Sequence, residues 1–264
     1  EVMLFFKKKK KIIGIALSGG GLRGIAHLGV LKALEEKGLQ PSVVSGTSAG
    51  AIVGAFYAAG YKPDELMEIV SNLSFFSPRA LRFSTSALFD RQMLLKIFHH
   101  YFPENSFSSL KLPLYAAATD IVSGRSVYFN DGLLDEALMA SASIPFVFPV
   151  TKIGEQYFLD GGIINNLPIE PIQDKCDILI GVSVNAISHQ EGINLSGRRL
   201  FDRVVHLALG QPVYQKSKQC NLFINPPDMT RFSMFDKKNA RQLFDYAYAY
   251  TIQYLEAHQE KILR

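Results

Sequence analysis

The sequence predicts an α/β fold of three layers, in which helices cover both faces of a mostly parallel central sheet. Short apolar runs typical of buried strands alternate along the chain with longer segments whose apolar residues recur with helical spacing. Glycines cluster directly after two of these strands, at the start of the helix that follows each one. Strands that alternate with helices favour parallel pairing in a layered sheet.

Length and composition agree with one folded domain. The chain has 264 residues, of which 48% are hydrophobic and 20% are charged. These values are typical of globular proteins and not of disordered chains. A single α/β domain commonly reaches roughly 250 residues. We therefore expect one domain over residues 12–264, preceded by a basic N-terminal segment over residues 1–11.

The basic character of the chain comes from one block near its N-terminus. The net charge is +4, but Lys7 to Lys11 supply five positive charges, and without them the balance is −1. Such a block suits an anionic membrane surface, a nucleic acid or a solvated strand start. We expect no nucleic-acid partner and leave peripheral membrane contact open. Glu1 and Val2 precede Met3, which is the expected natural start.

Neither a signal peptide nor a transmembrane helix is expected. The first residues lack the apolar stretch and the small-residue cleavage site of a signal peptide. Residues 39–61 are uncharged and long enough to span a bilayer. They contain Gln40, Pro41 and several serines and glycines, which fit a buried strand, a turn and a core helix better. A cytoplasmic protein, in peripheral contact with a membrane at most, is the expectation.

The first predicted unit is a strand, a glycine turn and a helix. Residues 11–17 form an apolar run, and three consecutive glycines, Gly19, Gly20 and Gly21, follow it. The next helix places apolar side chains at positions 25, 28, 31 and 34 on one face. Gly38 is a stop signal for this helix.

The second predicted unit surrounds one serine. Val43 and Val44 precede Gly46-Thr47-Ser48-Ala49-Gly50, and an apolar helix follows as far as Gly60. A G-x-S-x-G turn between strand and helix is a nucleophile elbow, which holds the serine on a strained backbone at a helix N-terminus. The flanking glycines remove the Cβ atoms that would clash where strand and helix converge.

The remaining elements are predicted from the same patterns. They are a helix over 64–73 with Pro63 in its first turn, a hairpin of strands 114–119 and 126–129, a helix over 131–142, strands 157–159 and 178–184, a surface loop over 188–199, a helix over 200–218, a strand over 222–224 and a final helix over 237–258.

Three segments supply the groups that a serine needs to attack an acyl carbonyl. Ser48 is the candidate nucleophile, and the bare N–H groups of the Gly19 to Gly21 turn are candidate donors to the oxyanion. Asp160 follows an apolar strand and precedes Gly161-Gly162, so its carboxyl can face a pocket while its strand is buried. An ordinary aspartate, with a pKa of about 3.9, is a poor base for a serine. Burial beside Phe158 is expected to raise this pKa.

Two other interpretations of the sequence compete with this site. A histidine triad would need His206 or His258 after Asp160, and both lie in helical patterns. Gly19, Gly21 and Gly24 also match the dinucleotide motif G-x-G-x-x-G, but the next strand lacks the acidic residue that binds ribose.

No metal site is predicted. His99-His100 is the one histidine pair, and it has no further residue at the spacing of metal ligands. We therefore expect no catalytic metal and no other cofactor.

With Gly19-Gly20-Gly21-Leu22-Arg23-Gly24, the Ser48 motif and Asp160-Gly161-Gly162 in this order, the chain resembles the patatin-like phospholipases, a family of lipid acyl hydrolases. Similarity extends to other family landmarks, which are Ala26-His27, Gly29-Val30, Ala118-Thr119-Asp120, Ser141-Ala142-Ser143-Ile144-Pro145, Phe148-Pro149 and Asn166-Leu167-Pro168. The fold that this resemblance implies is the three-layer patatin-like one.

The resemblance implies a catalytic dyad and not a triad. Ser48 would attack the ester carbonyl, Asp160 would act as its base, and the Gly19 to Gly21 loop, with the N–H of Ala49, would hold the oxyanion. Arg23 occupies a basic position of the loop motif, where its charge favours the loop conformation or a nearby anionic group. Gly46, Gly50, Gly161 and Gly162 would support these residues.

The implied reaction is hydrolysis of fatty acyl esters, of phospholipids above all, through an acyl-enzyme on Ser48. Acyl transfer to another alcohol and a catalytically silent lipid-binding or regulatory protein remain alternatives, because fold alone does not prove activity. The lipid substrate is the expected partner, and no oligomeric state is predicted.

Residues 74–110 differ from the rest of the chain. Phenylalanines and tyrosines there are interleaved with arginines and a lysine. This composition suits a lid or rim that touches acyl chains and headgroups. Aromatic residues that cover one end of the sheet as core are the favoured alternative.

Overall fold

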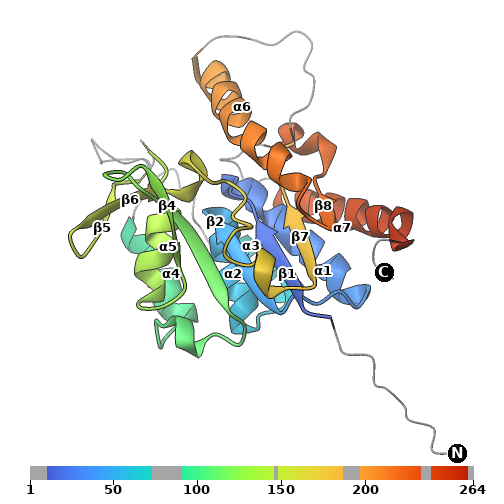
Figure 1. The fold of residues 1–264 in the computed structure, drawn as a ribbon, viewed down its shortest axis with the longest axis horizontal. Coiled ribbons are helices and arrows are strands. Elements are labelled where there is room, and N and C mark those ends of the chain that lie inside the picture. Colours follow the sequence, from blue (N-terminus) through green and yellow to red (C-terminus); the bar gives the residue numbers. More distant parts are fainter. Residues whose placement is uncertain (1–10, 73–90, 146–147, 187–196, 233–238, 261–264) are drawn as a thin grey trace, which may run out of the picture.

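The strands of the chain pair into one mixed sheet (Figure 1). The computed structural model describes residues 11–72, 91–145, 148–186, 197–232 and 239–260. Within them the strands are β1 (Ile13–Leu17), β2 (Val43–Thr47), β3 (Leu114–Asp120), β4 (Arg125–Phe129), β5 (Thr151–Ile153), β6 (Gln156–Asp160), β7 (Ile178–Val182) and β8 (Leu222–Ile224). Their order is β5-β6-β3-β2-β1-β7-β8, with β4 also paired to β3.

The strands at the centre of the sheet run parallel, as the alternation of elements predicts. β1 pairs in parallel with β2 and β7, β2 with β3, and β7 with β8, whereas the pairs that involve β4, β5 and β6 are antiparallel. The helices are α1 (Ile25–Glu36), α2 (Ala49–Ala59), α3 (Pro63–Asn72), α4 (Arg91–Tyr101), α5 (Leu134–Ser141), α6 (Gly197–Ser217) and α7 (Ala240–Ala257).

Side chains of β1 alternate between two cores. Ile15 and Leu17 join the larger core with α1, α2 and α7, whereas Ala16 joins a smaller core on the opposite face of the sheet. That opposite face is covered by the irregular segment 161–177 and by Val213 of α6. The predicted three-layer fold is therefore confirmed, with one outer layer built mainly from an irregular segment.

β2 and β6 share one edge of β3, because β4 occupies the other. β4 pairs with β3 from Ala116 to Asp120 and so fills its edge over that stretch. β2 pairs with residues 114–117 of β3, and β6 pairs with residues 118–120. Because β4 fills the first edge, β2 and β6 lie end to end along the second. Since β6 runs antiparallel to β3, the carboxyl ends of β2 and β6 meet.

Most predicted elements are confirmed within a few residues. The hairpin of β3 and β4, the strands β6, β7 and β8, and the helices α3, α5 and α7 lie where their patterns indicate. β5 was missed because a three-residue strand has too few alternations to be recognised.

The predicted loop over 188–199 is wrong in its described part, since α6 already begins at Gly197. Arginines are good helix formers, so polarity alone did not distinguish a loop from the start of an exposed helix. Residues 188–196 lie outside the described residues, as does the basic block at residues 7–10.

The lid prediction for residues 74–110 is only partly within the described residues. Residues 74–90 lie outside them, and residues 91–101 form α4. Phe98, Phe102 and Phe107 are buried in the larger core. These three aromatic residues are core, as the favoured alternative expects for this part of the segment.

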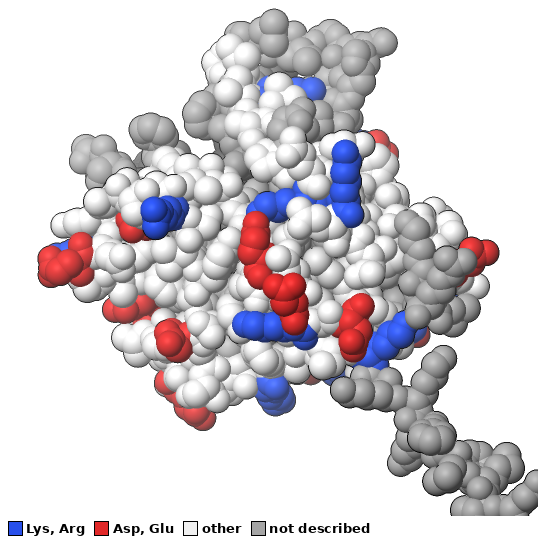
Figure 2. Space-filling model, in the orientation of Figure 1, with Lys and Arg blue, Asp and Glu red and all other residues white. Residues whose placement is uncertain are grey.

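Figure 2 shows basic and acidic side chains interspersed on one face of the described surface, without a large area of one sign. Residues 39–61 contain β2, the turn at Ser48 and α2, as expected. In the described ranges, no helix combines the length and the apolar character needed to cross a membrane.

Close packing of α1 on α7 gives the first prediction. A Cβ atom added to Gly29 would lie 2.2 Å from the Phe244 carbonyl oxygen and 2.8 Å from the Tyr248 nitrogen. Gly29→Ala should therefore destabilise the protein by about 1–3 kcal/mol, although alanine is the better helix former. Urea unfolding measures this. The control Lys37→Ala, which removes an exposed ion pair with Glu256, should change the stability by less than about 1 kcal/mol. A Gly29→Ala protein as stable as the wild type would contradict the close packing.

Candidate active site

Ser48 lies in a strained turn between β2 and α2. Its φ and ψ angles are 54° and −122°, a conformation that non-glycine residues rarely adopt. The Ser48 N–H donates a hydrogen bond to Ser141 Oγ at 2.8 Å, and Ser141 Oγ donates to the Ala117 carbonyl oxygen at 2.6 Å. One buried hydroxyl therefore connects the strained turn to β3.

The glycines on either side of Ser48 are required by close backbone contacts. A Cβ atom on Gly46 would lie 2.4 Å from the Gly50 carbonyl oxygen, and one on Gly50 would lie 2.3 Å from the Leu17 carbonyl oxygen. Real Cβ atoms do not approach backbone so closely. Both positions therefore need glycine for the reason that the sequence pattern indicates.

Asp160 lies at the carboxyl end of β6, opposite the end of β2. Its N–H donates to the Ser143 carbonyl oxygen at 2.9 Å, and its carbonyl oxygen accepts from Thr119 Oγ1 at 2.9 Å. Its carboxylate oxygen Oδ1 accepts from the Gly162 N–H at 2.7 Å. Among the described residues, Oδ2 has no hydrogen-bond partner. One carboxylate oxygen is thus anchored, and the other is available.

Gly161 explains how closely the two strand ends approach. A Cβ atom on Gly161 would lie 2.3 Å from the Ala117 carbonyl oxygen and 3.1 Å from Thr47 Cγ2. The chain after Asp160 therefore passes directly over the end of β2, immediately before Ser48.

The environment of Asp160 raises the pKa of its carboxyl to about 6. Burial is the main cause, and hydrogen bonding from the Ser48 hydroxyl and the Gly162 N–H acts in the opposite direction. The Ser48 hydroxyl is near enough to favour the charged carboxylate, although Oδ2 lacks a hydrogen bond of ordinary geometry. Such contacts between base and nucleophile often shorten only when substrate binds.

The glycine turn after β1 packs against Ser48. A Cβ atom on Gly19 would lie 3.1 Å from Ser48 Cβ. The Gly19 N–H, however, donates to Asn166 Oδ1 at 3.1 Å. In this structure it is therefore not the free donor that the sequence predicts. For the N–H groups of Gly20 and Gly21, no acceptor is found in the described part of the chain. Ala49 is the first residue of α2, whose first N–H groups have no partner within the helix.

Arg23 fixes the glycine turn to the C-terminal part of the chain. Its side chain is 2% exposed, and Nε donates to the Phe232 carbonyl oxygen at 2.7 Å. Two roles were expected for the Arg23 charge, and this contact agrees with the first, stabilisation of the loop conformation.

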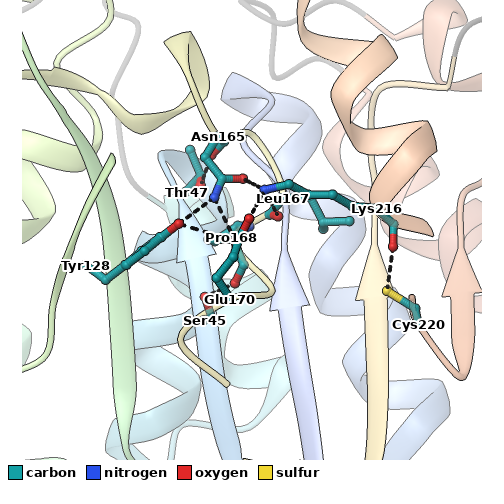
Figure 3. A network of polar contacts seen from close by, with 9 residues as sticks. All are labelled: Ser45, Thr47, Tyr128, Asn165, Leu167, Pro168, Glu170, Lys216 and Cys220. Atoms are coloured by element: carbon teal, nitrogen blue, oxygen red, sulfur yellow. Dashed lines mark hydrogen bonds and ion pairs between the residues drawn. The ribbon is translucent and has the colours of Figure 1, made fainter. Parts of the chain in front are cut away.

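The segment after Asp160 is held by a polar network (Figure 3). The Asn165 carbonyl oxygen accepts from Thr47 Oγ1 at 2.9 Å, and Lys216 Nζ of α6 donates to Asn165 Oδ1 and to Glu170. Although burial raises the pKa of Glu170, hydrogen bonds from Lys216 and Asn165 hold it below its ordinary value. The network ties β2, the Asp160 segment and α6 together, and it reaches β2 at Thr47, the residue before Ser48.

The described histidine side chains have other partners. His27 Nε2 lies 2.8 Å from the Ser18 carbonyl oxygen, and burial lowers the pKa of His27 to about 4, so the neutral ring donates this bond. His99 Nε2 lies 2.7 Å from Asp135, and His258 stacks on Tyr254. Over the residues that the structure describes, no group of three His, Cys, Asp or Glu side chains is placed to hold a metal ion.

Sequence reasoning missed the residues that hold the site together. Ser141 and Asn166 were noted as landmarks but given no role, and Asn185 was not noted. All three are buried polar residues near the end of an element: Ser141 is the last residue of α5, and Asn166 and Asn185 lie in the segments after β6 and β7. Burial of a polar side chain at such a position is the signal that would have identified them.

A buried serine in an elbow turn, beside a buried aspartate and a glycine turn, is an arrangement typical of serine hydrolases. A sequence model of the patatin-like phospholipases matches residues 15–173. The chain belongs to the patatin-like phospholipase family. This assignment replaces the dinucleotide-binding interpretation of Gly19, Gly21 and Gly24.

Similar proteins agree with the family. An uncharacterized NTE family protein from Mycobacterium bovis is 35% identical over 179 residues, which are 66% of this chain and 49% of that protein. Lysophospholipase NTE1 from Kluyveromyces lactis is 27% identical over 94% of this chain and 19% of its own length. The chain therefore spans half or less of these curated relatives.

The fold has a counterpart among solved structures. VipD from Legionella pneumophila matches with a TM-score of 0.56 at 15% sequence identity, over 94% of this chain and 67% of VipD. At this identity the likeness extends to the fold alone.

The raised pKa of Asp160 makes a prediction about stability. The folded protein holds the proton on this carboxyl more tightly than the unfolded chain does, so wild-type stability falls as the pH rises from about 4 to about 6. Asp160→Asn carries no charge and should be more stable than the wild type at pH 8 by on the order of 2–3 kcal/mol. The two proteins should converge below about pH 4. Urea unfolding at pH 4, 6 and 8 tests this, and a less stable Asp160→Asn protein at pH 8 would contradict it.

Proposed function

We propose that this protein is a serine-dependent lipid acyl hydrolase that cleaves fatty acyl esters of phospholipids or lysophospholipids. One observation carries the proposal. Ser48 and Asp160 stand at strand ends that meet on one edge of β3, where a buried carboxylate with one unpaired oxygen lies within the influence of the Ser48 hydroxyl. The family assignment and the lysophospholipase name of a relative support the choice of a lipid ester as substrate.

In the proposed acylation step, Asp160 Oδ2 accepts the proton of the Ser48 hydroxyl while Ser48 Oγ bonds to the ester carbonyl carbon. The N–H groups of Gly20, Gly21 and Ala49 stabilise the oxyanion that forms on the carbonyl oxygen. The ester bond then breaks, and the leaving alcohol takes the proton from Asp160. The acyl group remains on Ser48.

In the deacylation step, Asp160 accepts a proton from a water molecule that attacks the acyl-enzyme. The same N–H groups stabilise the second oxyanion, and Ser48 regains its proton as the fatty acid leaves. A carboxyl whose pKa is about 6 is largely ionised at neutral pH yet more basic than an ordinary aspartate, which suits both steps.

Apolar side chains lie close to the Asp160 turn. Ile163 and Ile164 follow it by three and four positions, and they are 48% and 40% exposed. Exposed apolar residues beside such a site suit contact with an acyl chain or with the surface of a membrane. We include peripheral membrane contact in the proposal on this ground.

Removal of either dyad residue tests the assignment. Ser48→Ala should abolish turnover of lysophosphatidylcholine, and Asp160→Asn should reduce it by at least about 10³-fold, as loss of a catalytic group does in other serine hydrolases. Fatty acid release is the measurement. Asn221→Asp, an exposed change at the far end of β7, serves as the control and should leave turnover unchanged. Wild-type rates in either dyad variant would refute the assignment.

The pH dependence of turnover is predicted from the pKa of Asp160. The charged carboxylate is the active form, so kcat/KM should rise with pH to a plateau above about pH 6. Initial rates for a soluble p-nitrophenyl ester between pH 4 and 8 measure this rise of kcat/KM on the acid side of the profile. Activity that is constant down to pH 4 would show that a carboxyl with a raised pKa is not the base.

A further inference from the structure

The backbone on either side of Gly19 is held by buried side chains. In the peptide group between Ser18 and Gly19, the N–H donates to Asn166 Oδ1 at 3.1 Å and the carbonyl oxygen lies 2.8 Å from His27 Nε2. Both polar atoms of this peptide group are therefore occupied, and its orientation is fixed from two opposite sides.

The next peptide group, between Gly19 and Gly20, is held from one side only. Its carbonyl oxygen accepts hydrogen bonds from Asn185 Nδ2 and from Ser18 Oγ, the latter at 3.1 Å. The peptide bond is trans, so its N–H points away from its carbonyl oxygen. The Gly20 N–H is therefore directed away from Asn185, and no acceptor for it is found among the described residues.

Asn185 is buried against the glycine turn, and its side-chain Oδ1 has no hydrogen-bond partner among the described residues. It follows β7, is 3% exposed, and its backbone N–H lies 3.4 Å from Ser183 Oγ. A Cβ atom on Gly20 would lie 2.5 Å from Val184 Cγ2, so the chain at residues 184–185 packs directly on the glycine turn. Asn185 lies outside the residues 15–173 that the family model matches.

We propose that Asn185 is the positioning residue of the oxyanion site. By donating to the Gly19 carbonyl oxygen, it fixes the peptide plane that aims the Gly20 N–H at the acyl oxygen. The same donation polarises the peptide group and strengthens its N–H as a donor, since linked hydrogen bonds reinforce one another. This inference rests on the proposed function, because the oxyanion exists only if Ser48 attacks an ester.

Asn185 acts through the backbone and not on the base. Its loss should therefore affect different kinetic parameters from the loss of Asp160. The peptide plane matters most when the carbonyl oxygen becomes an oxyanion, and little when the ester is only bound. Loss of Asn185 should therefore lower kcat. KM and the acid limb of the pH–rate profile, which reports the ionisation of Asp160, should stay unchanged.

Two variants remove the donor in different ways. Asn185→Leu keeps the approximate volume without a polar group, and Asn185→Asp keeps the shape but cannot donate. For each variant, kcat for a p-nitrophenyl ester should fall by about 10- to 100-fold. This loss is no larger than the loss caused by removal of one oxyanion donor. KM should stay within about twofold of the wild-type value. The rate constant for inactivation by a fluorophosphonate should fall in parallel, because the phosphonyl oxygen occupies the same site.

Asn221→Asp is the matched control. Asn221 lies at the opposite end of β7, where its Oδ1 accepts from the Leu179 N–H at 2.7 Å, and aspartate can still accept there. This variant should keep wild-type kcat and KM. Rates are expressed per Ser48 site labelled to completion by the fluorophosphonate, which corrects for protein that fails to fold. The pH profile is measured on Asn185→Leu, whose acid limb should coincide with that of the wild type.

Each outcome either supports or overturns the role of Asn185. Wild-type kcat in both Asn185 variants, a rise in KM without a fall in kcat, or a deficit that disappears after correction for labelled sites would overturn the role of Asn185 and leave the proposed function standing. A wild-type protein that neither hydrolyses the ester nor labels at Ser48 would overturn both. A fall in kcat per labelled site, with KM and the acid limb unchanged, supports the assignment.

Discussion

The meeting of two strand ends on one edge of β3 is the constraint on which the site depends. β2 ends at Thr47 beside Ala117, and β6 ends at Asp160 beside Ala118. This register alone brings together a serine and an aspartate that are far apart in the sequence. Ser141 adds to it, because its hydroxyl bonds both the Ser48 N–H and the Ala117 carbonyl oxygen. A shift of β6 by one residue would turn the Asp160 side chain to the other face of the sheet.

The arrangement has a cost in stability. Ser48 adopts a backbone conformation with positive φ. Within the described residues, one oxygen of the buried Asp160 carboxyl is unpaired and the N–H groups of Gly20 and Gly21 have no acceptor. Each of these features is typically worth on the order of 1–3 kcal/mol of destabilisation. The surrounding packing and the polar network that reaches Thr47 offset them. Strain and unpaired groups that cluster at one point of a well-packed fold are typical of a functional site.

The parts of the site that local chemistry dictates were predictable from the sequence. The turn at Ser48 needs glycine at positions 46 and 50 because of contacts within one strand-turn-helix unit, and such contacts leave a pattern in adjacent residues. The rise in the pKa of Asp160 follows from its position at the end of an apolar strand.

The contacts that distant segments make with the glycine turn were not predictable. Gly19 was expected to donate to the oxyanion, but its N–H bonds Asn166, which is 147 residues away. Asn185 contacts the same glycine from a third segment. The order of strands decides these pairings, and a single sequence does not reveal it. The aromatic residues of α4 were ambiguous for a related reason, since composition does not show which side of a helix is covered.

The ends of β2 and β6 enclose the Asp160 carboxyl away from water beside Ser48. Carbon-13 NMR titration of aspartate carboxyl groups, with Asp160 assigned by comparison with Asp160→Asn, measures this enclosure directly. A pKa of about 6 for Asp160 is the result that the enclosed carboxyl predicts. A value near the ordinary one of about 3.9 would mean that the carboxyl is open to solvent, and the end-to-end meeting of the two strands would not hold.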